Sequence, residues 1–297
     1  PGRRDHHLAQ ALTCLGAMLH VLQDMASPTH VRNDFAPGHL ERLGSGSLNR
    51  GAAYERFVAR RYGRLGIPGY RGPAIKRGSL RDFFHSSRWD GLADLTHLGH
   101  FSPGTLPAKT KIRAGMDLAR LQERLVKSLP FEKPALGKVD LTCAAKKTCY
   151  LRAPDSKRPL LAYRLGRKGE LMFRLDPRVH AAAARELLPL AVGFSAGFID
   201  HLLRGQVDLS LKTADRVEVI NKSGGLTAAR VRVLAEDEAG KRTLLAEHTL
   251  DKPVETGAVL ADLAVKIPKG TRRLVALVEG TEQQTNDPLV ATKLLDL

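Results

Sequence analysis

The segment at residues 19–30, with the sequence LHVLQDMASPTH, decides how the first part of the chain folds. Leucines leading into it recur every three or four residues, and this spacing predicts an amphipathic helix over 5–26 with a core-facing stripe of Leu8, Leu12, Leu15, Leu19 and Leu22. Pro28 cannot donate a backbone hydrogen bond, so the helix must end before it and the chain must turn.

The two polar residues of this segment lie on another face of the predicted helix. His20 and Asp24 are one turn apart, so an imidazole nitrogen and a carboxylate oxygen could meet the same cation. The alternative is a helix-surface pair that contributes only a few tenths of a kcal/mol. The turn at Pro28 brings His30 near the end of the helix, and this third donor favours a metal site.

The run from His20 to Asn33 resembles the signature of the zinc-dependent phospholipases C, whose superfamily also contains single-strand nucleases. The shared positions are His20, Asp24, Pro28, His30 and Asn33. The stretch GAAYERFV at 51–58 is similar to a later family segment whose glutamate binds metal. FSAGFIDHLLRG at 194–205 is similar to the last helix of bacterial members that carry a C-terminal β domain.

This resemblance implies two zinc ions inside an all-helical domain. His20 and Asp24 would bind one zinc, with Asp24 able to bridge, and His30 and Glu55 would bind its neighbour. Asp24 and Glu55 are therefore the predicted catalytic residues of a phospholipase C-type phosphodiesterase that cleaves a phosphate ester with a metal-bound hydroxide.

The sequence also departs from the family pattern. Gly51 stands where the family has a histidine four residues before the glutamate, and His39 could substitute from its Gly/Ser-rich loop. Other family ligands precede the signature by more residues than this chain has. The alternative function is a zinc-binding but catalytically inactive surface or interaction module.

Positive charge is concentrated in the first two thirds of the chain. Residues 211–297 hold 13 Lys/Arg and 13 Asp/Glu, so the net charge of +16 belongs to residues 1–210. A basic surface around a cleft attracts anionic substrates, although a solvated basic face is the alternative. We expect a phospholipid headgroup or other phosphodiester as substrate, with peripheral contact to an anionic membrane. Nucleic acid is less favoured because aromatic residues are sparse and not interleaved with Lys/Arg.

Periodicity changes after Gln206, where short β-rich runs alternate with turn signals. The predicted fold is a mainly α-helical phospholipase C-like domain at 1–209 followed by a small all-β sandwich at 210–297. Weak alternation at 137–175 could mark a hairpin inserted among helices, and residues 117–129 are expected to form a short helix. The sequence contains no run of 18 or more apolar residues, so it does not predict a membrane-spanning helix.

The cysteines and the first residues of the sequence indicate the compartment in which the protein is expected. Cys143 and Cys149 bracket five residues and could close a disulfide in an oxidising compartment, whereas Cys14 is predicted to be a buried helix residue. The sequence begins at Pro1 with neither Met nor a signal-peptide core, which predicts a processed or truncated product. We expect a secreted, periplasmic or cell-surface protein.

Overall fold

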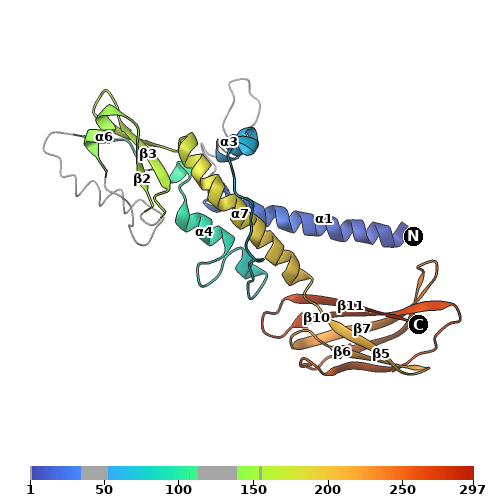
Figure 1. Ribbon diagram of the computed structural model, residues 1–297. Coiled ribbons are helices and arrows are strands. Elements are labelled where there is room, and N and C mark those ends of the chain that lie inside the picture. Colours follow the sequence, from blue (N-terminus) through green and yellow to red (C-terminus); the bar gives the residue numbers. More distant parts are fainter. Residues whose placement is uncertain (1, 35–52, 107, 113–138, 154–155) are drawn as a thin grey trace. The chain divides into compact units, whose positions relative to one another are not determined.

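The computed structural model describes residues 2–34, 53–106, 108–112, 139–153 and 156–297 (Figure 1). About one third of the chain is helix and one third is strand, with three antiparallel sheets, so the fold is mixed α/β and mainly β in its C-terminal half. The predicted fold class, a mainly α-helical domain followed by a small all-β sandwich, is therefore wrong, because a four-stranded sheet also lies between residues 110 and 174.

The chain forms two compact units, each built from segments far apart in sequence. One combines residues 1–17, 74–80 and 196–297, and the other combines residues 18–73 and 81–195. The domain boundary between residues 209 and 210 stays a prediction.

The described helices are α1 (Gly2–Asp24), α2 (Pro28–Val31), α3 (Ala53–Arg61), α4 (Leu92–Gly99), α6 (Leu141–Lys146) and α7 (Pro177–Leu202), with short 3-10 turns at Tyr62–Arg64, Arg81–Phe83 and Pro103–Thr105. In α1 the predicted apolar stripe is buried only at its C-terminal end. Leu22 is fully buried, whereas Leu8 and Leu12 are each more than half exposed. The helix predicted at 117–129 lies outside the described residues.

Helix α7 is the longest helix in the described part of the chain. By length and composition it could cross a membrane, and half of its most apolar stretch is buried. The core helix of a soluble protein and a membrane span share these properties, so hydropathy alone does not separate them.

The first sheet contains β1 (Thr110–Lys111), β2 (Cys149–Arg152), β3 (Pro159–Leu165) and β4 (Glu170–Arg174), in the order β1-β4-β3-β2. Sequence analysis anticipated at most a hairpin here. The reason is visible in β3, where the four consecutive residues from Leu160 to Tyr163 are all buried. Burial on both faces removes the apolar-polar alternation by which strands are recognised.

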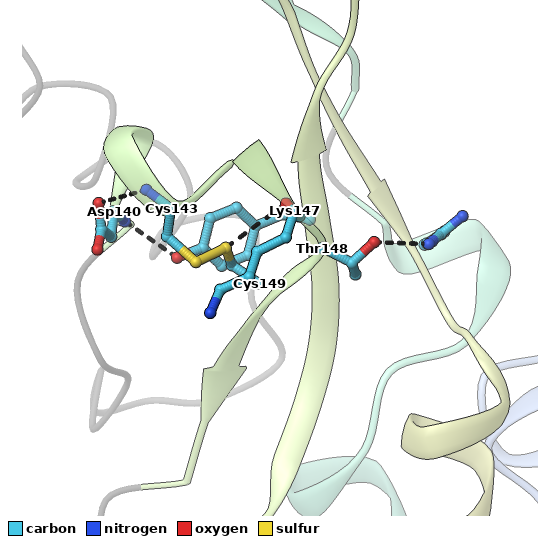
Figure 2. The surroundings of a disulfide bond; sticks show 7 residues. Asp140, Cys143, Lys147, Thr148 and Cys149 are labelled. Carbon is cyan, nitrogen blue, oxygen red and sulfur yellow. Dashed lines mark hydrogen bonds between the residues drawn. A yellow bond between two sulfur atoms is a disulfide. The ribbon is translucent and has the colours of Figure 1, made fainter. Parts of the chain in front are cut away.

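A disulfide joins α6 to the start of β2 and confirms the predicted pairing of Cys143 with Cys149 (Figure 2). Asp140 caps α6 by accepting a hydrogen bond from the backbone N–H of Cys143, and its own N–H donates to the hydroxyl of Tyr163. Helix, disulfide and sheet thus form one cross-linked structure. Cys14, predicted to be buried, is instead exposed.

The strands predicted after Gln206 are present as two antiparallel sheets. They are β5 (Val207–Thr213), β6 (Arg216–Asn221) and β9 (Val259–Ala264) in one sheet, and β7 (Leu226–Asp237), β8 (Arg242–Leu250), β10 (Thr271–Glu282) and β11 (Pro288–Asp296) in the other. One apolar core includes residues of both sheets, among them Val217, Val231 and Leu274, which are fully buried. Alternating side chains of each sheet therefore supply a shared interior.

One charged residue is buried in the second of these sheets. Glu236 on β7 is 2% exposed and lies opposite Arg242 on β8 and Arg273 on β10. Arg242 and Arg273 donate hydrogen bonds of 2.6 and 2.7 Å to its two oxygens. These bonds, that of Arg242 first, hold the pKa of Glu236 below its ordinary value of 4.5.

We predict that Cys143→Ser destabilises the protein by about 2 kcal/mol, because the disulfide closes a short loop and restricts the unfolded chain. Thermal unfolding under non-reducing conditions measures the loss. Cys14→Ser is the matched control, since Cys14 is an unpaired, exposed cysteine. Equal midpoints for native protein and Cys143→Ser would contradict a stabilising role.

We predict that Glu236→Gln lowers the unfolding temperature at neutral pH. Since the folded-state pKa of Glu236 is lowered, its contribution is complete above the unfolded pKa near 4.5 and is lost as the pH falls through the folded value. The gap between native protein and variant should therefore narrow below about pH 4.5. Calorimetry from neutral to acid pH tests this, and a gap independent of pH would refute the assignment.

Candidate metal-binding site

The end of α1 and the start of α2 are separated by a turn of three residues. The backbone N–H groups of Met25, Ala26 and Ser27 donate to the carbonyls three residues earlier. Pro28 then occupies the first turn of α2, where its missing N–H leaves no donor unsatisfied. This turn places His30 beside the last turn of α1.

All four residues predicted as zinc ligands are brought together. Asp24 Oδ2 lies 3.6 Å from His20 Nε2 and 3.7 Å from His30 Nδ1. The other ring nitrogen of His30, Nε2, lies 2.7 Å from Glu55 Oε1 on α3. His30 therefore stands between two carboxylates and contacts one with each nitrogen.

Polar residues that follow His30 hold this segment in place. Arg32 donates to the backbone carbonyls of His97 and His100, at the end of α4. Burial of the Arg32 guanidinium lowers the pKa of this side chain to about 10. Asp34 accepts a hydrogen bond from the backbone N–H of Gly104. Arg32 and Asp34 thus fasten the residues at and after the end of α2 to neighbouring segments.

The four residues line one open cavity of about 450 Å³. His20 is the most accessible, with its side chain 76% exposed, whereas Asp24, His30 and Glu55 are 24–34% exposed. The rest of the wall is largely apolar and includes Ala26, Tyr54, Val58, Ala59 and Leu188. A small molecule can therefore reach partly desolvated imidazole and carboxylate groups.

The donor set fits zinc in type and partly in spacing. Ligand atoms bound to one tetrahedral zinc at about 2.0–2.1 Å lie about 3.3 Å apart. The two separations from Asp24 are slightly longer than this, while His30 and Glu55 are in direct hydrogen-bond contact. Within the described ranges, no three His, Cys, Asp or Glu side chains form a complete metal-binding group. Binding by all four would require His30 and Glu55 to separate slightly.

Two residues of this cavity, Ser27 and Tyr54, were not predicted as site residues. Ser27 is 6% exposed, and its hydroxyl donates to Glu55 Oε1 at 2.9 Å. Tyr54 is buried, and its hydroxyl has no hydrogen-bond partner among the described residues. Burial, followed by the Glu55 carboxylate, raises the pKa of Tyr54, which keeps its phenol neutral.

The remaining candidates do not add a ligand here. His39 and Gly51 lie outside the described residues. His97 and His100, which are three residues apart in the sequence, do not line the cavity. Burial lowers the pKa of His100 to about 3, so this side chain is a neutral interior imidazole.

No model of a known protein family matches this chain, and no curated protein matches it either.

We predict that Ser27→Ala destabilises the protein by about 1–2 kcal/mol, because a buried hydrogen bond to a carboxylate is lost. Chemical denaturation gives the free energy of unfolding. Ser27→Thr keeps a hydroxyl and should recover most of the loss. If the alanine variant unfolds like the native protein, Ser27 does not hold Glu55.

Proposed function

We propose that this protein is a zinc-dependent phosphodiesterase of the phospholipase C type. His20 and Asp24 hold one zinc, and His30 and Glu55 contribute to a neighbouring one. The observation that carries the proposal is the meeting of these four side chains, from α1, α2 and α3, at a single cavity. Imidazole nitrogen and carboxylate oxygen are donor types that zinc takes in catalytic sites.

Charge supports a cation at this position. The carboxylates of Asp24 and Glu55 would repel a phosphate ester that entered the cavity. A divalent ion between them would reverse the local charge and favour the anion. Zinc bound there would polarise a phosphoryl oxygen and supply a nucleophile at neutral pH.

The chain's own residues would orient the donors and limit access of water. Asp24 lies within 4 Å of one nitrogen of each histidine, so its carboxylate could share a cation with either ring. Ser27 holds Oε1 of Glu55, and the apolar wall of Val58, Ala59 and Leu188 excludes water from one side. Tyr54 supplies a neutral buried hydroxyl on the same wall.

An oxidising compartment is the proposed location. The disulfide between Cys143 and Cys149 supports it, because such bonds persist mainly in secreted, periplasmic and cell-surface proteins.

A catalytically inactive zinc-binding or interaction module is the second candidate. The direct contact between His30 and Glu55 favours it, since two hydrogen-bonded side chains can fasten α2 to α3 with no ion between them. Measurements of bound zinc and of phosphodiester hydrolysis distinguish the two proposed functions.

We predict that His20→Ala and Asp24→Ala each lower zinc content at least several-fold and abolish stabilisation by added zinc, because ligand loss weakens binding coupled to the folded state. Elemental analysis after dialysis and thermal unfolding with and without zinc measure both effects. Turnover of phosphatidylcholine and of bis(p-nitrophenyl) phosphate tests hydrolysis.

His248→Ala is the control, because His248 lies on β8, is exposed and is no part of the site. Zinc content unchanged in both ligand variants would refute the metal site. Zinc binding without turnover of either substrate would favour the inactive module.

A further inference from the structure

More than half of the net positive charge lies on one small part of the structure. The described residues among 108–178 comprise the first sheet, α6, their connecting segments and the first residues of α7, and they carry twelve Lys/Arg and three Asp/Glu, a net charge of +9 out of +16. We call these residues the basic sheet. Its cations are Lys109, Lys111, Lys146, Lys147, Arg152, Lys157, Arg158, Arg164, Arg167, Lys168, Arg174 and Arg178, and its acids are Asp140, Glu170 and Asp176.

Strand register places several of these cations together. Arg174 is paired with Ala162, Arg164 with Met172, and Lys111 with Glu170, and side chains two residues apart share a face. Arg164, Arg174 and Lys111 therefore lie on the same face of the sheet. The opposite face contributes Leu151, Leu161 and Leu171 to the core.

Two further cations, Arg167 and Lys168, lie in the turn that joins β3 to β4, where Gly169 has a positive φ of 70°. Lys146 is the last residue of α6 and Lys147 caps it, next to the disulfide that Figure 2 shows beside Lys147. All four are exposed. The disulfide ties the end of α6, which carries the second pair, to the start of β2 in the sheet.

Little of this charge is neutralised. Among the cations of the basic sheet, Arg158 is the one that forms an ion pair with another described residue, with Glu186 at 2.6 Å. The other eleven are exposed to solvent. Clustered cations without acidic partners attract multivalent anions strongly, and salt screens the attraction.

The chemistry of this surface fits lipid headgroups better than single-stranded nucleic acid. Sequence-tolerant nucleic-acid binding uses exposed aromatic rings for base stacking. Here the ring of Tyr150 lies beneath Arg152 and Arg178, at 5.7 and 5.9 Å, and its hydroxyl donates to Asp176. No large apolar side chain of the described basic sheet is exposed.

We propose that the basic sheet is an electrostatic docking surface for anionic phospholipid headgroups. It binds at the membrane surface through Lys and Arg without inserting apolar side chains. The choice of a lipid partner rests on the proposed phosphodiesterase function, since docking would bring that enzyme to its substrate. The binding itself needs neither zinc nor turnover.

The test compares two full-length variants that lose the same number of charges. In the sheet variant, Lys146, Lys147, Arg164, Arg167 and Lys168 are changed to Gln. In the control variant, five exposed lysines of the C-terminal β region are changed to Gln: Lys222, Lys241, Lys252, Lys266 and Lys269. The two variants have the same net charge, so a difference in their vesicle binding depends on where the charges were removed.

Co-sedimentation measures binding to phosphatidylcholine vesicles with and without about one third phosphatidylserine. We expect the native protein to bind the anionic vesicles and to dissociate as ionic strength rises from about 0.05 to 0.5 M. The sheet variant should lose at least about 100-fold in partitioning, because each basic residue near the surface contributes severalfold. The control variant should lose far less.

Three results would overturn the proposal. The two variants could lose vesicle binding equally, or the native protein could bind neutral and anionic vesicles equally. The sheet variant could also lose binding to duplex or single-stranded DNA while its vesicle binding is unchanged. Asp24→Ala separates this inference from the proposed function. Its vesicle binding should equal that of the native protein even if zinc and turnover are lost. A sheet variant that binds vesicles normally therefore refutes docking and leaves the metal site untouched.

Discussion

The missing backbone N–H of Pro28 is the constraint on which the candidate site depends. Because Pro28 cannot continue α1, the chain closes a tight turn and restarts as α2, with Ser27 and His30 directed toward α3. Ser27 and His30 both contact the same oxygen of Glu55, so this carboxylate is held from two sides. Arg32 then fastens α2 to the end of α4. Without the turn, His20 and Asp24 would remain an exposed pair on a helix surface.

Charge is used differently in the two compact units. Glu236 is buried between two arginines, where hydrogen bonds to both oxygens compensate for its desolvation. In the basic sheet eleven of the twelve cations are exposed, and Arg158 alone among its described cations forms an ion pair with a described residue. Arginines thus stabilise a buried carboxylate in the C-terminal β region, whereas in the basic sheet they lie on the surface.

The disulfide-linked sheet shows that a family resemblance based on a short motif does not predict the whole fold. The signature from His20 to Asn33 implies an all-helical domain, yet four strands lie between residues 110 and 174. A ligand pattern constrains one turn and two helices, and it leaves segments more than 70 residues away undetermined. Fold and site are separate properties of a chain, and each needs its own evidence.

The sequence alone determined what depends on local geometry. It predicted the grouping of His20 with Asp24, the turn at Pro28, the pairing of Cys143 with Cys149 and the strands after Gln206, because each rests on short spacing or on a period that survives in the sequence. Tertiary structure decided the rest. Burial of β3 on both faces concealed its alternation, and α1 exposes Leu8 and Leu12 although their spacing predicted a core. The family resemblance had grouped His30 with Glu55, but the hydrogen bond from Ser27 to Glu55 joins residues 28 apart in the chain, and only the folded structure shows it.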